Sequence, residues 1–322
     1  MRRGSGFLGR LFGPAPTAPC GAGWELALWP RFAEAAVSFT FDDGADAQFS
    51  DGAALLEACG FRGTFFVPLA AREYPVDFEA ARRCAAAGHE IGSHTVTHPH
   101  LPKLSDAELE RELGESAAGL ETKFGRPVPT LAYPYFEYDA RVKAAAARHY
   151  VLARGRGKRP APAVPRDRYE VPSDTIRHFN TAEQLRRRVE KAMAVRGWCV
   201  HTLHRIHRPM LDEHLAWLRE QGRRVWVAPF GAVATYLLAR AAARVERRIF
   251  ADRLRLRLIT SLDPRLRAPR LSLRVALPAE WKSCRVAQSG AELEREEQEL
   301  RGARWADCEA MPGEDEIEMR RA

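Results

Sequence analysis

Apolar, β-prone runs alternate with helical segments between residues 36 and 93, and this order constrains the fold more than any other feature of the chain. The β-prone runs cover residues 36–41, 63–67 and 89–93, and the helical segments cover residues 53–59 and 80–87. Glycine follows each helical segment, at the position where helices commonly end. Strands that alternate with helices in this way pair in parallel, with the helices packed outside them.

The same alternation continues to residue 246. Ser105 and Thr181 begin capping boxes, with Glu or Gln three residues later, and so predict the first residues of two further helices. Further strands are predicted at residues 130–133, 198–203 and 224–228, and further helices at residues 139–149, 211–221 and 233–245. The chain of 322 residues is long enough for one large α/β barrel and a small second module.

The pattern changes after residue 246. Residues 253–258 and 271–277 alternate between apolar and polar side chains, as half-buried strands do. Residues 293–300 are rich in charge, and we interpret them as a helical or disordered insert. We therefore predict three parts: a flexible Gly/Pro-rich leader over residues 1–23, the barrel over residues 24–246, and a small β-rich module over residues 247–322.

The composition is that of an ordinary globular protein, with 46% hydrophobic and 29% charged residues. The six cysteines are scattered without a close pair, which predicts reduced thiols. We find no apolar run long enough to cross a membrane and no clean secretory signal. We therefore expect no membrane partner and a cytoplasmic location, with secretion as the alternative if the start codon is misplaced.

The net charge is +8, and the densest basic stretch is residues 154–168, RGRGKRPAPAVPRDR. This stretch is either a contact surface for an anionic polymer or a solvated Pro/Arg loop. Its arginines have no aromatic residues among them, which argues against nucleic-acid binding. We therefore interpret it as a solvated loop and predict no nucleic-acid partner.

Two aspartates, Asp42 and Asp43, follow the first predicted strand and precede a glycine. Adjacent carboxylates at the end of a buried strand repel each other, so the pair needs a cation or a shared proton. With a metal ion present, one carboxylate can bind it while the other acts as a base. An ordinary Asp-Asp-Gly turn is the alternative, and the pair alone does not exclude it.

Two histidines four residues apart, His94 and His98, form the second candidate. On a helix this spacing places both side chains on one face, where they can bind one cation. Two surface histidines on a loop are the alternative. Two histidines and one carboxylate leave open positions for water and substrate, as catalytic metal sites do. Two weaker candidates follow later strands: the segment Tyr133-Pro134-Tyr135, and His204, which has other histidines nearby.

These segments together resemble the motifs of the polysaccharide deacetylase family, the NodB-type proteins like carbohydrate esterase family 4. Residues 38–44 (SFTFDDG) resemble its first motif, and residues 88–98 (GHEIGSHTVTH) resemble its second. Residues 132–135 (AYPY) and 203–204 (LH) are similar to the third and the last motif. The resemblance covers roughly residues 29–245, with the motifs in the family's order.

The resemblance implies a distorted (β/α) barrel of the NodB type and a divalent metal ion, usually zinc. It implies that the metal ligands are Asp43, His94 and His98. It further implies that Asp42 is the catalytic base and His204 the general acid, and that the backbone N–H of Tyr135 donates to the oxyanion.

Two positions depart from the family's pattern. Many members carry an arginine where Ala132 stands, and that arginine braces the catalytic base. Its absence predicts a divergent branch, or another residue that does the same work. The family's remaining motif is an aspartate that tunes the catalytic histidine, and Asp174 is the nearest candidate here, although its neighbours match poorly.

The predicted activity is metal-dependent hydrolysis of a non-peptide carbon–nitrogen bond, which removes acetyl groups from an N-acetylated carbohydrate. The same site would also suit an O-acetyl esterase or a hydrolase of small amides. A different class of protein, an inactive barrel that binds carbohydrate, is favoured only by the missing arginine at Ala132. The sequence does not set the oligomeric state.

Overall fold

The computed structural model describes residues 23–157, 165–263, 265–300, 302–313 and 315–322. Of the predicted leader, residues 1–22 therefore lie outside the described residues. The described chain divides into two compact units. The first is Glu34–Ala234, and the second combines residues 23–33 with Thr235–Ala322.

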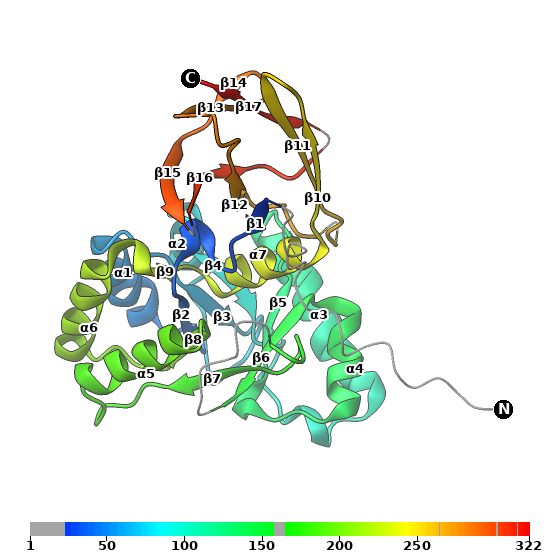
Figure 1. The fold of residues 1–322 in the computed structure, drawn as a ribbon. Coiled ribbons are helices and arrows are strands. Elements are labelled where there is room, and N and C mark those ends of the chain that lie inside the picture. Colours follow the sequence, from blue (N-terminus) through cyan, green and yellow to red (C-terminus); the bar gives the residue numbers. More distant parts are fainter. Residues whose placement is uncertain (1–22, 158–164, 264, 301, 314) are drawn as a thin grey trace. The chain divides into compact units, whose positions relative to one another are not determined.

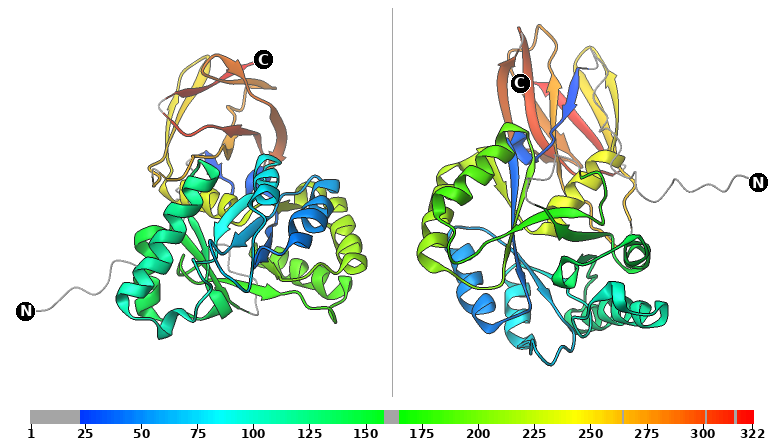
Figure 2. Two further views of the ribbon diagram at one scale, coloured as in Figure 1. Left: turned by 180° about the vertical axis from the view of Figure 1, so that it is seen from behind. Right: turned by 90° about the horizontal axis from the view of Figure 1, so that it is seen from below.

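Seven parallel strands close a ring in the first unit (Figures 1 and 2). In order around the ring they are β2 (Ala35–Asp42), β3 (Thr64–Val67), β4 (Glu90–Ser93), β5 (Thr130–Ala132), β6 (Leu152–Arg156), β7 (Val171–Thr175) and β8 (Trp198–Leu203), which returns to β2. β9 (Val225–Val227) pairs with the first half of β2, and β3 pairs with its second half. The predicted distorted (β/α) barrel is therefore confirmed.

The helices lie outside the ring of strands (Figure 1). They are α1 (Ala53–Ala58), α2 (Phe78–Ala86), α3 (Asp106–Phe124), α4 (Ala140–His149), α5 (Ala182–Ala194) and α6 (Arg208–Glu220). In the chain, α7 (Phe230–Ala242) begins in this unit and ends in the second. The predicted capping boxes are present at Ser105 before α3 and at Thr181 before α5. The apolar faces of α1 to α6 pack on the outward side chains of the strands and form the main core of this unit.

Strands β6 and β7 are absent from the sequence-based prediction. The basic stretch that we interpreted as a solvated loop begins inside β6, where Arg154 is fully buried. Residues 158–164 of that stretch lie outside the described residues. The predicted helix at residues 233–245 was too long at its end, because α7 stops at Ala242 and β10 (Arg244–Ile249) begins two residues later.

The second unit contains two antiparallel sheets. One has the order β1 (Trp24–Leu26), β12 (Leu271–Ala276), β16 (Ala303–Ala310), β15 (Arg295–Leu300). The other has the order β10, β11 (Arg253–Ile259), β17 (Glu316–Arg321), β13 (Cys284–Gln288), β14 (Ala291–Glu292). Pairing between β1 and β12 places the residues before the barrel in this unit.

The strands predicted at residues 253–258 and 271–277 are β11 and β12. The helical or disordered insert predicted at residues 293–300 was wrong. Six consecutive residues there form β15 and pair with β16. The five cysteines in the described ranges are free thiols. Across these ranges, no helix combines the length and the apolar character needed to span a bilayer.

Candidate metal centre

The predicted site residues come from separate strands and meet at one end of the barrel. Asp42 is the last residue of β2, and His94 directly follows β4. His204 directly follows β8. The carboxyl ends of parallel strands in a barrel point to the same end, and active sites of such barrels are built there.

Asp43, His94 and His98 form a compact cluster. Asp43 Oδ1 lies 3.6 Å from the Nε2 atoms of both His94 and His98. One ligand atom from each residue lies within 4.8 Å of the other two. Both histidines are buried, and Asp43 is partly exposed, so the cluster has one side open to solvent. The three predicted metal ligands are therefore brought together.

The spacing of these atoms fits a bound divalent ion. A tetrahedral ion with bonds of about 2.0–2.1 Å holds its ligand atoms about 3.3 Å apart. The 3.6 Å separations from Asp43 need only a small adjustment to meet that value. Two imidazoles and one carboxylate are donors that zinc and similar ions accept. Three ligands would leave a position for water or substrate.

His94 is held with one particular ring nitrogen toward the cluster. Its Nδ1 lies 2.7 Å from the backbone oxygen of Ala132. A carbonyl oxygen only accepts hydrogen bonds, so Nδ1 carries the proton and donates it. The lone pair is therefore on Nε2, which faces Asp43. A hydrogen bond of this kind behind a histidine ligand sets its tautomer and ring orientation.

His98 is buried and neutral. Burial and the neighbouring His94 lower the pKa of His98 to about 4, although Asp43 and Asp42 act in the opposite direction. An imidazole with this pKa is uncharged near neutral pH, the form that binds a metal ion. Tyr74 and Tyr135 pack edge-on against the ring, with centroids 4.8 and 4.6 Å away.

The sequence-based interpretation placed the two histidines on one face of a helix, and this was wrong. Residues 94–98 form an irregular turn in which Thr95 has φ 69° and His98 has φ 61°. Asp43 also has a positive φ, 77°. Residues other than glycine rarely adopt this conformation, and such strain is concentrated at functional sites. The ligands therefore converge through strained backbone on two loops.

Asp42 lies beside the cluster and is gripped by Arg154 from β6. Arg154 donates from Nη1 to Asp42 Oδ1 over 2.9 Å and from Nη2 to Oδ2 over 2.7 Å. Neither side chain is more than 2% exposed. Arg154 is the Cα partner of Ala132 across the β5–β6 pairing. The arginine that is missing at Ala132 is thus replaced by one from the neighbouring strand.

Polar and aromatic groups inside the barrel fix the position of Arg154. Its Nη1 also donates to the hydroxyl oxygens of Thr40 and Thr202, over 3.0 and 2.8 Å. The guanidinium carbon lies 5.2 Å from the ring centre of Phe66 and 5.0 Å from that of Phe136. Planar guanidinium groups stack on aromatic rings in this way. The arginine is therefore a rigid part of the barrel interior.

The charge on Asp42 is maintained against its burial. Burial alone would raise the pKa of Asp42, but its electrostatic interactions, foremost with the Arg154 guanidinium and then with His94 and His204, more than offset this and lower the pKa below its ordinary value. The carboxylate is therefore ionised at neutral pH. A buried, ionised carboxylate in a fixed orientation is suited to accept a proton from a water molecule.

His204 completes the group of residues around Asp42. Its Nε2 lies 3.7 Å from Asp42 Oδ2, and 40% of its side chain is exposed. Gln48, a buried residue that the sequence did not indicate, donates from Nε2 to the backbone oxygens of both Asp42 and His204. It belongs to a short π-helix, η2 (Gln48–Gly52), a form that is frequent at functional sites. Gln48 therefore ties the ends of β2 and β8 together.

Tyr135 stands at the rim of the site. It lies in a turn, η4 (Pro134–Phe136), with φ 55°, and 40% of the residue is exposed. Its ring stacks on His100 at 4.2 Å, and His100 Nδ1 lies 2.8 Å from Glu137 Oε2. These contacts hold the strained turn next to His98.

Asp174 is not brought to this group. Its carboxylate forms an ion pair with Arg188 of α5 at 3.1 Å. The preceding residue, Ser173, points into the barrel and bonds to Thr202. Side chains on a strand alternate between its two faces, so Asp174 faces the helices instead of the barrel interior. A tuning aspartate at this position is therefore not supported.

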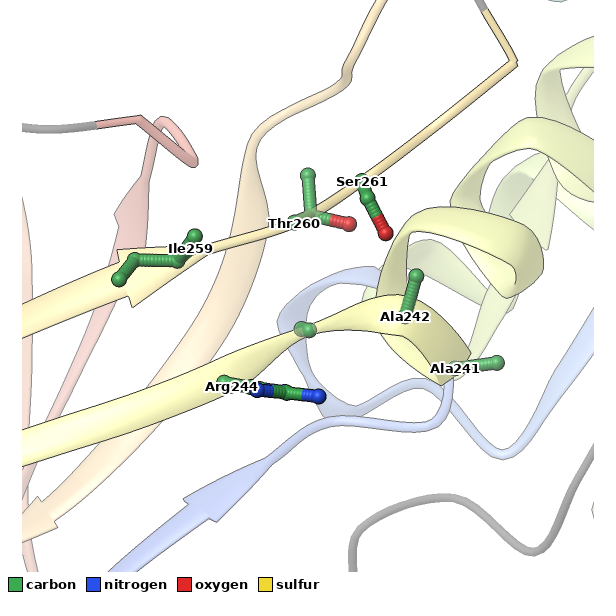
Figure 3. Close-up of a pocket in the computed structure, with 7 residues that line it drawn as sticks. Ala241, Ala242, Arg244, Ile259, Thr260 and Ser261 are labelled. Atoms are coloured by element: carbon green, nitrogen blue, oxygen red, sulfur yellow. The ribbon is translucent and has the colours of Figure 1, made fainter.

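A pocket of about 640 Å³ lies in the second unit, lined by residues 241–244 and 259–261 (Figure 3). Its size falls within the range of ligand cavities. Arg244 is its only ionisable residue, and its lining contains no histidine, cysteine or carboxylate. The cluster at Asp43 is the one group of potential metal ligands found in the described residues. The chemistry of the chain therefore points to the barrel.

The carboxyl ends of the barrel strands thus carry a group of possible metal ligands beside an aspartate that Arg154 holds in place. Residues 31–152 match the family model described as polysaccharide deacetylase. The predicted resemblance to the polysaccharide deacetylase family is therefore confirmed over residues 31–152. A Mycobacterium smegmatis structure assigned provisionally to the same family has a similar fold, with a TM-score of 0.51 and 22% identity, over 65% of this chain and 92% of that one.

Curated relatives match this chain over parts of their length. A chitin deacetylase from Pestalotiopsis sp. is 32% identical over 32% of this chain and 35% of its own length. A peptidoglycan-N-acetylglucosamine deacetylase from Bacillus cereus is 31% identical over 32% of this chain and 40% of its own. A gellan lyase from Bacillus sp. is 27% identical over 92% of this chain but only 13% of its own length. Each relative is thus matched over less than half its length.

Proposed function

We propose that this chain is a metal-dependent hydrolase that removes acetyl groups from an N-acetylated carbohydrate. The observation that carries the proposal is the placement of the Asp43, His94 and His98 cluster beside an ionised, braced Asp42. A metal-binding cluster next to a fixed base is the arrangement that hydrolysis by activated water requires.

The chemistry follows from the atoms at the site. A divalent ion held by Asp43, His94 and His98 would lower the pKa of a water molecule and polarise the acetyl carbonyl. Asp42 would accept a proton from the attacking water, and the oxygen of that water forms the new bond to the carbonyl carbon. The backbone N–H of Tyr135 donates to the oxyanion; loss of one such donor typically costs about 2.7–4 kcal/mol. His204 then protonates the leaving nitrogen, the carbon–nitrogen bond breaks, and acetate and an amine are released.

The relatives support an N-acetylated carbohydrate as the substrate class. Two of them are named for chitin and for peptidoglycan N-acetylglucosamine. O-Acetyl esters and small amides remain alternatives, because the same atoms would hydrolyse them. An inactive barrel that binds carbohydrate was favoured by the absent arginine at Ala132. That alternative loses its support, because Arg154 makes the contact that the position lacks.

The test is acetate release from N-acetylglucosamine oligomers, peptidoglycan fragments and acetylated xylan, with and without added zinc. We expect metal-dependent release from an N-acetylated substrate. Asp42→Asn should abolish turnover while zinc still binds, because the amide has no basic oxygen and Asp42 is not part of the cluster. Release of acetate from xylan alone would favour the esterase. Zinc binding without release from any substrate would contradict the proposed deacetylation.

A further inference from the structure

The turn that carries the two histidines needs a support of its own. Thr95 and His98 both have positive φ, which is costly for residues other than glycine and especially for β-branched threonine. A strained turn of this kind persists only when surrounding groups hold it in place. The chain contains an acid that does so.

Glu112 on α3 binds this turn with both of its carboxylate oxygens. Glu112 Oε2 accepts hydrogen bonds from the backbone N–H groups of Val96 and Thr97, both over 2.9 Å. Glu112 Oε1 accepts one from the hydroxyl of Thr97 over 2.7 Å. The side chain is buried, with the residue 6% exposed. Hydrogen bonds to an ionised acceptor are about twice as strong as those between neutral groups.

A second residue on the same helix face holds the other end of the turn. Ser116, one helical turn after Glu112, donates to the backbone oxygen of Thr95 over 3.0 Å and lies 2.7 Å from the hydroxyl of Ser93. Residues four apart on a helix face the same way, so both reach the turn from α3. Glu112 accepts three hydrogen bonds from the turn and holds residues 96 and 97, the part of the turn next to His98.

If Glu112 served only the stability of α3, its hydrogen bonds would lie within that helix. They go instead to the turn that carries the two histidines. α3 has its own capping box at Ser105 and Glu108, and Gly125 closes it in the left-handed conformation. Its core contacts come from Leu109, Leu113 and Leu120. The capping and the core packing of α3 therefore do not depend on Glu112.

We propose that Glu112 is a positioning residue that keeps His98 in its metal-binding orientation; this rests on the proposed metal site. His94 is held separately, through its Nδ1 and the backbone oxygen of Ala132. The backbone of His98 bonds to Thr95 Oγ1 inside the turn over 3.1 Å. Loss of the Glu112 carboxylate should therefore release His98 and leave His94 in place.

The experiment measures zinc affinity of the full-length protein by competition with a chromophoric chelator. We compare Glu112→Ala and Glu112→Gln with the wild type and with Glu115→Ala, an exposed acid on the same helix. Loss of a group that orients a metal ligand typically weakens metal binding by about 10–100-fold. We expect a loss in this range for Glu112→Ala, a smaller one for Glu112→Gln, which keeps one acceptor oxygen, and none for Glu115→Ala.

A double variant separates positioning from a general loss of structure. Because Glu112 acts through His98, adding Glu112→Ala to His98→Ala should weaken zinc binding little beyond His98→Ala alone. Far-ultraviolet circular dichroism and thermal unfolding of each metal-free variant show whether it folds. If Glu112→Ala does not fold, Glu112→Gln decides the question.

Wild-type zinc affinity in the folded Glu112 variant would overturn the proposal, and so would full additivity with His98→Ala. Histidine NMR of the metal-free protein gives a readout that does not depend on zinc. Glu112→Ala should shift the ring signals of His98 and leave those of His94 unchanged. Zinc binding without acetate release would refute the proposed activity and leave this proposal standing. Unchanged His98 signals would refute the role of Glu112 whether or not the wild type binds zinc.

Discussion

Arg154 holds Asp42 with two hydrogen bonds, of 2.9 and 2.7 Å, inside the barrel and away from solvent. The guanidinium reaches the carboxylate from β6, while the strand that carries Ala132 lies next to it. Paired N–H donors fix both the charge and the orientation of a carboxylate. The orientation of the proposed base thus depends on a residue outside the family's recognised segments.

Replacing Arg154 should damage both stability and activity. Arg154→Met leaves Asp42 buried without its partner, and breaking a buried ion pair in this way costs about 3–5 kcal/mol. Urea unfolding checks this value, with Arg156→Ala, an exposed arginine on the same strand, as the control that should change little. Burial then raises the pKa of Asp42, so the acid limb of the pH–rate profile moves to higher pH.

Moving the arginine from β6 to β5 tests whether an arginine on either strand can hold the Asp42 carboxylate. Ala132 and Arg154 are Cα partners, and the alternation along β5 directs residue 132 into the barrel. The double variant Ala132→Arg with Arg154→Ala should recover part of the acetate release that Arg154→Ala loses. A folded double variant as inactive as Arg154→Ala would show that the position of the arginine matters as much as its charge.

Zinc should stabilise the folded protein through the three clustered residues. A ligand that binds only the folded state adds about 2.7 kcal/mol when its free concentration is 100 times its Kd. Asp43→Ala and His94→Ala should each lose the zinc-dependent rise in the thermal unfolding midpoint. His100→Ala should keep the rise, because His100 Nδ1 is engaged with Glu137. An equal rise in Asp43→Ala and the wild type would place zinc elsewhere.

Two buried histidines, His201 in β8 and His214 in α6, should make the protein sensitive to acid. His201 and His214 are fully buried, and burial lowers the pKa of His214 to about 3 and that of His201 well below its ordinary value. Below pH about 6.5 these two histidines bind protons in the unfolded chain but stay neutral in the folded chain. The free energy of unfolding therefore falls as the pH falls. The expected slope is about 1.4 kcal/mol per pH unit for each histidine, down to the folded-state pKa.

His214→Phe should remove one of these two contributions. Among the residues that the structure describes, neither ring nitrogen of His214 has a hydrogen-bond partner, and the ring lies against Trp217 and Phe39, so phenylalanine suits the site. Urea unfolding between pH 6.5 and pH 4 should show a shallower fall in stability than the wild type. Trp217→Phe, which alters the packing without removing a titrating group, should keep the wild-type slope. A His214→Phe slope equal to that of the wild type would contradict this account.

Much of the fold and the cluster follows from local patterns in the sequence. Alternating strands and helices, capping boxes and the spacing of Asp43, His94 and His98 are visible without coordinates. The reason the histidines converge is not, because a spacing of four residues suits a helix as well as the strained turn that is present. The predicted geometry was therefore wrong although the residues lie together.

The role of Arg154 was not predicted because β6, the strand that carries it, has no recognisable strand pattern in the sequence. β6 reads LARGR and runs into a basic, proline-rich stretch, so neither apolar alternation nor a strand-forming composition marks it. Glu112 was missed for a related reason, since a charged residue on an amphipathic helix normally faces solvent. Both residues are recognised by the partners they meet from distant parts of the chain. Asp174 failed in the opposite way, because strand alternation turns it toward α5.

The hydrogen bond from the His94 side chain to residue 132 is accepted by the main-chain oxygen of that residue, and its side chain takes no part. Every amino acid offers the same carbonyl oxygen at that point, so histidine orientation places no demand on which side chain occupies the position. The orientation of His94 and the support of Asp42 therefore depend on different groups, a main-chain oxygen on β5 and an arginine side chain on β6. A substitution at residue 132 therefore leaves the acceptor of His94 in place, while the support of Asp42 comes from a side chain on β6.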